Sequence, residues 1–312
     1  LAGLHWETCI VYLDDMIVCG KTFEDMVKNL DEVFARLQEA GLKLKARKCQ
    51  LFARKVNFLG HVISEDGICT DPKKTECVRN WPNPTNVKEV RSFLGFCSYY
   101  RRFIFRFAEI AKPLHKLTQK GVRFTWTSEC QNAFQSLKTK LVNAPVLAHP
   151  DFSQSFILDV DACDQSIGAV ISQKINGEEH AVGFASRTLT KSERAYCVTR
   201  KELLALVTFV KHYKHYLYGK KFLVRTDHSS LKWLMNFKNP EGQIARWIET
   251  LSCYDMKVEH RPGRLHQNAD GVSRIPCTQC GVNEETSSPS VNVVESSNSD
   301  AFDLKKIQNS DR

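Results

Sequence analysis

Short apolar runs separated by turn-forming residues fill the first part of the chain. Each run has the length and the content of β-branched or aromatic residues that favour a strand. Asp66-Gly67 is a dipeptide typical of the turn that follows a strand. The strands predicted from this pattern cover residues 10–12, 16–18, 42–52 and 56–64.

Apolar residues at helical spacing mark four segments between and after these runs. Thr22-Phe-Glu-Asp25 resembles a capping box in which Asp replaces the usual Glu, and Gly41 is expected to end the helix that follows it. Asp71-Pro72 begins a short helix, because proline is favoured in the first turn. The predicted helices cover residues 26–37, a short segment from 71 that Pro82 and Pro84 break, residues 87–107 and residues 129–142.

From residue 155 the pattern changes to strands that alternate with helices, with Asn176-Gly177 as a hairpin turn. Strands followed by alternating helices and strands predict a mixed sheet with helices packed on it. Residues 277–312 are rich in Ser, Asn and Glu, and they are predicted to be disordered. The predicted strands cover residues 156–161, 167–174, 181–186, 222–227 and 256–259, and the predicted helices cover residues 200–217, a stretch around Leu231 and a short segment at Ala269.

Basic side chains outnumber acidic ones, with 44 Lys and Arg against 35 Asp and Glu. Residues 1–150 carry 23 basic and 15 acidic side chains, whereas residues 277–312 carry 3 and 6. The basic excess therefore belongs to the part that is expected to fold, as a polyanion-binding surface requires.

The 12 cysteines are scattered singly through apolar runs, as in reduced intracellular proteins rather than secreted disulfide frameworks. Cys277 and Cys280 have the spacing of metal ligands, but no second Cys or His pair follows them, so a closed zinc site is not expected. No apolar run approaches the length of about 18 residues that a membrane span needs, and there is no signal peptide. We therefore expect an intracellular, cytoplasmic protein without membrane partners. Because the chain begins at Leu1 directly on motif-like sequence, we expect a piece of a longer protein.

Asp14 and Asp15 place two like charges inside an otherwise apolar run. One interpretation is the tip of a hairpin, since Asp favours turns and both flanks read as strands, although neither Gly nor Asn is present for a positive φ. The other is a divalent cation above the turn that offsets the charge. This stretch alone does not decide between the two.

Four acids of the second half stand at the ends of predicted elements. Asp161 and Asp227 end apolar strands, Glu202 opens a helix, and Asp270 opens the last one. Because element ends can bring distant residues together, they could bind two cations for phosphodiester hydrolysis. Each also has a structural explanation: Glu202 lies three residues after Thr199 as in a capping box, and the aspartates could close strands or favour a helix N-terminus.

Several motifs follow one another along the chain. Val11-Tyr-Leu-Asp-Asp15 resembles the catalytic turn of reverse transcriptases. The segments Gly41-Leu-Lys-Leu-Lys-Ala-Arg-Lys-Cys49 and Asn57-Phe-Leu-Gly-His-Val-Ile63 resemble the later palm motifs and the primer grip of gypsy-type LTR retrotransposon polymerases. The second half resembles the ribonuclease H domain of the same polyproteins through Asp159-Val-Asp-Ala-Cys163, Ile167-Gly-Ala-Val170, Thr199-Arg-Lys-Glu-Leu-Leu-Ala205, Arg225-Thr-Asp-His228 and Asn268-Ala-Asp-Gly-Val-Ser-Arg274.

This resemblance implies a multidomain fold of α/β and α+β class. Its parts are the C-terminal part of a polymerase palm (1–68), a thumb-like helical region (69–112), a connector (113–150), a ribonuclease H-like mixed five-stranded sheet with flanking helices (151–276) and the tail (277–312). The resemblance further implies that Asp161, Glu202, Asp227 and Asp270 bind two Mg²⁺ or Mn²⁺ ions, that His260 assists catalysis, and that Asp14 and Asp15 are two of the three polymerase metal ligands. The third would lie upstream of this sequence. Asp159 falls at a variable position and is excluded.

These matches imply an endonuclease that cleaves the RNA strand of RNA–DNA hybrids. The endonuclease would be attached to an incomplete reverse transcriptase. The thumb residues Arg91, Arg101, Arg102, Arg106, Tyr99 and Tyr100 are expected to follow the backbone of a hybrid or primer-template. The rest of the Pol polyprotein, with an upstream polymerase part and a downstream integrase, is the implied partner. The alternative is a decayed copy of the element that only binds nucleic acid.

Overall fold

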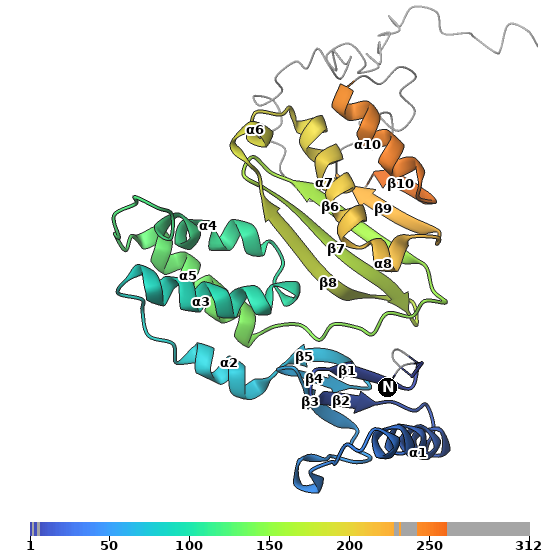
Figure 1. Ribbon diagram of the computed structural model, residues 1–312. Helices are drawn as coiled ribbons and strands as arrows, with labels where there is room; N and C mark the ends of the chain where they lie inside the picture. Colours follow the sequence, from blue (N-terminus) through green and yellow to red (C-terminus); the bar gives the residue numbers. More distant parts are fainter. Residues whose placement is uncertain (2, 5–6, 228–230, 232–241, 261–312) are drawn as a thin grey trace, which may run out of the picture. The chain divides into compact units, whose positions relative to one another are not determined.

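A computed structural model describes residues 1, 3–4, 7–227, 231 and 242–260 of the 312-residue chain (Figure 1). All of these residues belong to one unit, Leu1–Arg274. The predicted disordered tail, the helix predicted at Ala269 and most of the helical stretch around Leu231 lie outside the described residues.

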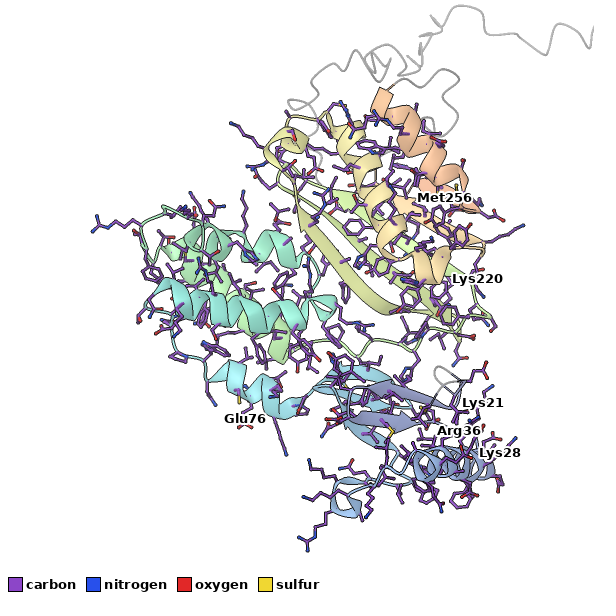
Figure 2. The ribbon with its side chains drawn as sticks, in the orientation of Figure 1. Lys21, Lys28, Arg36, Glu76, Lys220 and Met256 are labelled. Atoms are coloured by element: carbon purple, nitrogen blue, oxygen red, sulfur yellow. The ribbon has the colours of Figure 1, made fainter. Side chains whose placement is uncertain are left out.

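The N-terminal part begins with a hairpin and a helix. Strands β1 (Cys9–Tyr12) and β2 (Asp15–Val18) pair antiparallel, and helix α1 (Phe23–Glu39) follows with Thr22 as its N-cap. The α1 side chains of Leu30, Val33 and Leu37 are buried. Lys28 and Arg36 lie on the exposed part of the same helix (Figure 2), so α1 is amphipathic as its spacing predicts.

A three-stranded antiparallel sheet follows, made of β3 (Lys55–Phe58), β4 (His61–Ser64) and β5 (Gly67–Thr70). The segment predicted as one strand at 56–64 is two strands, β3 and β4, because the chain turns at Leu59 and Gly60, which have φ values of 48° and 71°. The strand predicted at 42–52 is wrong. That segment pairs with no strand, and its regular part is the 3₁₀ turn η1 (Ala46–Lys48).

Four helices and a 3₁₀ turn form the middle of the chain: α2 (Pro72–Arg79), α3 (Val87–Tyr99), η2 (Arg101–Phe103), α4 (Phe107–Leu117) and α5 (Ser128–Val142). The single helix predicted for 87–107 is wrong, because α3 ends at Tyr99 and Arg106 takes a left-handed conformation with φ 55°. Phe93, Phe103, Phe134 and Leu137 are almost fully buried in the core that these elements share.

A mixed five-stranded sheet forms the second half, as predicted. Its strands are β6 (Phe156–Ala162), β7 (Ser166–Ile175), β8 (Glu178–Thr188), β9 (Phe222–Thr226) and β10 (Met256–His260). They lie in the order β10-β9-β6-β7-β8. β6, β7 and β8 are antiparallel neighbours, whereas β9 runs parallel to both β6 and β10. The carboxyl ends of β6, β9 and β10 therefore meet at one edge.

Helix α7 (Val198–His212) lies across this sheet and contacts β6 and β7, with α10 (Gly242–Ser252) packed beside it (Figure 1). Short helices α6 (Lys191–Arg194) and α8 (Lys214–Leu217) flank α7. The single helix predicted for 200–217 thus ends at His212 and restarts at Lys214. Helix α10 was not predicted from the sequence.

Helix α4 packs on β8, and this contact joins the middle of the chain to the sheet. The backbone N–H of Ala108 donates to Ser186 Oγ at 2.9 Å, and Phe105 contacts the ring of Phe184. An isolated bridge between Ile68 and Leu147 ties the three-stranded sheet to the segment after α5.

Candidate active site

Three of the four predicted acids converge at the edge where β6 and β9 end. Asp161 is near the end of β6, Asp227 directly follows β9, and Glu202 projects from α7. One carboxylate oxygen from each lies within 4.8 Å of the other two. Parallel neighbours place their carboxyl ends side by side, which explains how acids 66 residues apart in sequence meet here. Asp270 lies outside the described residues.

Glu202 is the buried member of this cluster, with 2% of its surface exposed. Its Oε1 accepts a hydrogen bond from the backbone N–H of Ala162 at 3.0 Å. Its Oε2 is buried and has no hydrogen-bond partner among the residues that the structure describes. Burial, followed by the charges of Asp227 and Asp161, raises the pKa of Glu202 well above the ordinary value of a glutamate.

The capping-box interpretation of Glu202 is wrong. Helix α7 starts at Val198 with Cys197 as its N-cap, so Thr199 already lies inside the helix. Glu202 is then the fifth helical residue, and its carboxylate contacts β6 instead of the start of its own helix.

The cluster fits one or more hard divalent cations. A buried carboxylate oxygen without a hydrogen-bond partner is costly unless a cation or a proton compensates its charge. Three carboxylates supply the all-oxygen ligands that Mg²⁺ and Mn²⁺ prefer. Asp161 and Asp227 are more exposed than Glu202, so the cluster is open to solvent on their side.

His260 lies beside the cluster as the last residue of β10. Its Nε2 is 2.9 Å from the backbone oxygen of Asp227. Because a carbonyl oxygen only accepts, Nε2 is the protonated nitrogen and Nδ1 is the basic one in the neutral ring. The exposed imidazole is thus oriented by the residue that carries a cluster acid.

Arg106 reaches the cluster from the start of α4. Its Nη2 donates a hydrogen bond to Asp161 Oδ2, and its Nη1 lies 3.7 Å from Glu109. Burial lowers the pKa of Arg106, but the hydrogen bond to Asp161 and the charges of Asp161 and Glu109 together outweigh it, so that the pKa is raised. Of the predicted nucleic-acid-binding residues, Arg106 alone contacts an acid of the cluster within the described part of the chain.

The other predicted nucleic-acid-binding residues make contacts within the protein. Arg101 and Arg102 donate to the β8 carbonyls of Ser186 and Val182. Arg91 donates to the carbonyl of Thr118 at 3.0 Å and remains exposed.

The two tyrosines bind the turn between β3 and β4. Tyr100 is 2% exposed, and its hydroxyl donates to Gly60 O at 2.6 Å. Tyr99 is exposed and donates to Leu59 O. Tyr100 therefore has a packing role in this structure, whereas the ring of Tyr99 remains accessible.

Asp14 and Asp15 lie at the tip of the first hairpin. Leu13 supplies the positive φ of 53° that a two-residue turn needs, although neither Gly nor Asn is present. The predicted hairpin is confirmed, and the cation site above its turn stays a prediction. Both aspartates are exposed, and the described residues hold no third acid that groups with them.

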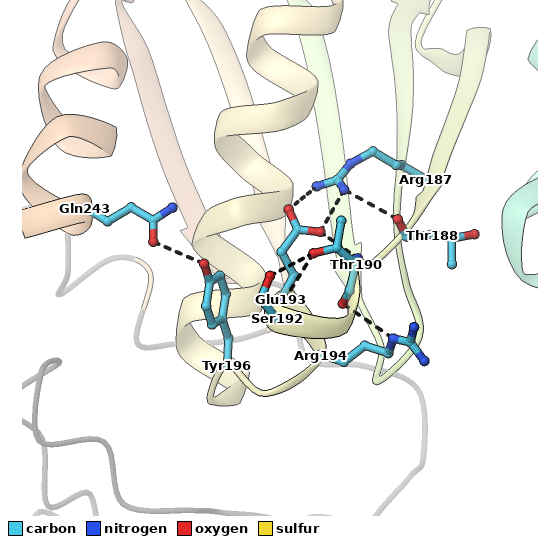
Figure 3. Close-up of polar contacts among 8 residues, drawn as sticks. All are labelled: Arg187, Thr188, Thr190, Ser192, Glu193, Arg194, Tyr196 and Gln243. Atoms are coloured by element: carbon cyan, nitrogen blue, oxygen red, sulfur yellow. Dashed lines mark hydrogen bonds and ion pairs between the residues drawn. The ribbon is translucent and has the colours of Figure 1, made fainter.

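A capping box does precede α7, at a position that the sequence reasoning missed. Thr190 Oγ1 accepts from the Glu193 N–H at 3.3 Å, and the Glu193 carboxylate accepts from the Thr190 N–H at 2.8 Å (Figure 3). Arg187 binds the same carboxylate with both Nη atoms, at 2.8 and 3.0 Å. Thr190-Lys-Ser-Glu193 has the capping-box spacing and was a readable signal for this turn.

Two family models match the chain. Residues 3–63 match the reverse transcriptase (RNA-dependent DNA polymerase) family, and residues 126–224 match the RNase H-like domain found in reverse transcriptase. The second match includes Asp161 and Glu202 and ends shortly before Asp227.

Similar proteins and structures agree with these matches. The Retrovirus-related Pol polyprotein from transposon 412 of Drosophila melanogaster is 41% identical over 88% of this chain and 22% of its own length. The Transposon Tf2-3 polyprotein of Schizosaccharomyces pombe is 34% identical over 91% of this chain and 22% of its own length. A structure of the foamy viral protease-reverse transcriptase in complex with dsDNA has a TM-score of 0.69 at 25% identity, covering 82% of this chain and 55% of that one.

Fold and site thus define part of a reverse transcriptase joined to a ribonuclease H-like domain. The chain belongs to the Pol polyproteins of LTR retrotransposons, as its motifs predict, and it spans about a fifth of the two relatives described above. Among the described residues, no helix combines the length and apolar character that crossing a membrane would need.

Proposed function

We propose that residues 151–276 form a ribonuclease H-type endonuclease that hydrolyses the RNA strand of RNA–DNA hybrids with two Mg²⁺ or Mn²⁺ ions. The observation that supports it most is the carboxylate cluster: Asp161, Glu202 and Asp227 bring oxygens within 4.8 Å of one another. One of the three is buried with an oxygen that has no hydrogen-bond partner in the described chain. A fold alone would not require this arrangement, whereas cation binding explains it.

The protein residues have separate tasks in this proposal. Asp161, Glu202 and Asp227 would hold the cations together with Asp270, which lies outside the described residues. Glu202 is fixed by the Ala162 N–H and gives the site its rigid side. His260 donates its Nε2–H to the Asp227 carbonyl, which leaves Nδ1 as the ring nitrogen that would accept a proton. Bound cations would supply the activation of water and the stabilisation of the leaving oxygen.

Substrate binding is proposed for basic and aromatic side chains of the middle segment. Arg91, Arg101 and the ring of Tyr99 are exposed on the middle segment, and Arg106 lies beside Asp161. Contacts to phosphates and to ribose 2′-hydroxyls would select the hybrid by shape, with little preference for base sequence. The hybrid and a primer-template are the proposed partners, together with the rest of the Pol polyprotein.

The first 68 residues are proposed to be the C-terminal part of a polymerase palm, residues 69–112 a thumb-like region and residues 113–150 a connector. In the alternative proposal, a decayed copy would bind nucleic acid without cutting it. The convergence of three acids at the sheet edge favours the enzyme, because decay has no reason to preserve it.

The decisive experiment compares the full chain with Asp161→Asn on a hybrid labelled separately on each strand. With Mg²⁺ present, the parent should cut RNA and spare DNA, and Asp161→Asn should lose activity by at least about two orders of magnitude. Asp164→Asn is the matched control, because Asp164 is 84% exposed, pairs with Lys201 and does not belong to the cluster. Equal cleavage by the parent and Asp161→Asn, prepared side by side, would end the proposal.

A further inference from the structure

Asp159 and Arg225 face each other across the two strands that carry the cluster aspartates. They form a register pair between β6 and β9. Arg225 Nε donates to Asp159 Oδ1 at 2.7 Å, and Nη2 donates to Oδ2 at 2.5 Å. Each residue lies two positions before an acid of the cluster, Asp161 on β6 and Asp227 after β9.

The same guanidinium also binds a third strand. Arg225 Nη1 and Nη2 donate to the Glu179 carboxylate of β8 at 2.9 and 2.5 Å. Ser172 of β7 donates to Glu179 at 2.8 Å. A polar row therefore crosses β9, β6, β7 and β8, and the side chain of Arg225, which begins it on β9, is 13% exposed.

This pair stands where the backbone pairing between β6 and β9 stops. Their register runs from Phe156↔Phe222 to Asp159↔Arg225 and ends there. Beyond this residue pair, and within the described residues, β6 remains paired only with β7, and β9 remains paired only with β10. The ladder between β6 and β9 therefore does not extend to Asp161 and Asp227, whose like charges repel each other when ionised.

We infer that Arg225 is a positioning residue. Its bidentate hydrogen bonds to Asp159 fix the distance between Asp161 and Asp227, so that the two carboxylates are preorganised to bind divalent cations. This inference rests on the proposed function. Two parallel hydrogen bonds from a planar guanidinium fix both distance and angle, which a lysine ammonium cannot do. Asp159 thus has a defined task although it is not part of the cluster.

The test measures cation binding directly, without substrate. Calorimetric titration of Mn²⁺ into the full chain should show about tenfold weaker binding for Arg225→Lys and Arg225→Gln, the scale reported for residues that orient metal ligands. Glu179→Gln is the matched control. It removes the negative charge of another carboxylate that binds the Arg225 guanidinium, and it leaves the contact between Arg225 and Asp159 intact. Its Mn²⁺ affinity should stay within about threefold of the parent.

Hybrid cleavage supplies the second measurement. The Mg²⁺ concentration for half-maximal rate should rise in the Arg225 variants, while KM for the hybrid stays within about twofold of the parent. A raised KM and a flatter salt dependence with unchanged Mn²⁺ affinity would show that Arg225 binds nucleic acid, and would overturn the inference.

Thermal unfolding in EDTA separates positioning from folding. If Arg225→Gln does not fold, Asp159→Asn carries the same expectation of weaker Mn²⁺ binding with a nearly unchanged shape. Folded variants with parental Mn²⁺ affinity contradict the inference alone. A parent chain that binds Mn²⁺ without cutting hybrid contradicts the proposed function alone, and a parent that binds no Mn²⁺ contradicts both.

Discussion

The guanidinium of Arg106 donates a hydrogen bond to Oδ2 of Asp161, 55 residues away in sequence. Arg106 adopts a left-handed conformation directly before α4, with φ 55° and ψ 34°. A non-glycine residue in this region is uncommon and is strained unless its surroundings hold it. The charged guanidinium of Arg106, at the helix break between α3 and α4, thus lies beside an acid of the cluster.

The first prediction follows from this contact. Arg106 and a divalent cation compete for the charge of Asp161, so Arg106→Gln should lower the Mn²⁺ concentration for half-saturation by roughly two- to fivefold, the range expected of a partly exposed ion pair. Calorimetry in the absence of substrate measures this directly. Weaker Mn²⁺ binding by Arg106→Gln would mean that the arginine supports the metal site and would contradict competition.

The second prediction concerns Glu202 and pH. Its pKa is raised in the folded chain by burial and by Asp227 and Asp161, whereas the unfolded chain has the ordinary value of about 4.3. The folded state thus holds the proton more tightly, and in EDTA the stability should fall as pH rises from about 4.3 through the raised value. Glu202→Gln removes this titration, so above that window it should be more stable than the parent by on the order of 1–3 kcal/mol.

Urea unfolding in EDTA at several pH values tests this, and added Mg²⁺ should reverse the order of the two proteins. A parent and a Glu202→Gln variant with parallel stability curves would show that the carboxylate carries no such cost. Hybrid cleavage by Glu202→Gln should be nearly abolished, since an amide cannot replace the charge that holds a cation.

The positions of two aspartates at strand ends could be read from the local pattern, whereas their role as metal ligands was implied only by the family resemblance. Asp161 and Asp227 each close an apolar strand, and strands of a parallel pair end together. For Glu202 the local signal misled: Thr199 and Glu202 have capping-box spacing, but the helix begins at Val198 and the box that forms is Thr190 with Glu193. The residue at which α7 starts depends on packing against the sheet, and a four-residue capping-box pattern carries no information about that packing.

Other errors have the same origin. The break after α3 coincides with Tyr99 and Tyr100, whose hydroxyls donate to the carbonyls of Leu59 and Gly60, 40 residues away. Leu59 has a positive φ that its own residue type disfavours, so neither that turn nor the helix end was readable from neighbouring residues. The pairing of Asp159 with Arg225 was likewise not readable from neighbouring residues, because the two are distant in sequence and adjacent in the sheet.

The third prediction is acid destabilisation through His61. Burial and then the charge of Arg102 lower the pKa of His61, whose ring stacks on Tyr99 with centroids 5.3 Å apart. The unfolded chain binds the proton more readily, so stability is fully present above about pH 6.5 and is lost as pH falls through the lowered value. His61→Phe keeps the stacking and should reduce this loss.

The measurement is urea unfolding between pH 7.5 and 5. Burial and Arg101 also lower the pKa of His115 and His212, so the acid loss should shrink in His61→Phe without disappearing. An identical loss in parent and variant would exclude His61 as a contributor.

The fourth prediction is that the 312-residue chain does not extend a primer. Asp14 and Asp15 are exposed at a hairpin tip, and within the described residues no third acid groups with them. Metal-assisted nucleotide transfer depends on a complete and aligned ligand set. Template-dependent incorporation above that of an Asp15→Ala control would show that the prediction is wrong.

The fifth prediction concerns hybrid binding by the middle segment. Arg91 is exposed on α3, and its guanidinium donates a hydrogen bond to the carbonyl of Thr118. If its guanidinium meets a backbone phosphate, Arg91→Gln should weaken hybrid binding uniformly across sequences and reduce the slope of log affinity against log salt by about 0.9.

Arg36→Gln is the matched control, with the same charge change on the exposed part of α1. Binding is measured by fluorescence anisotropy in EDTA, so that cleavage does not interfere. Equal slopes for Arg91→Gln and Arg36→Gln would place the phosphate contacts elsewhere, whereas a loss confined to Arg91→Gln would identify α3 as part of the hybrid-binding surface.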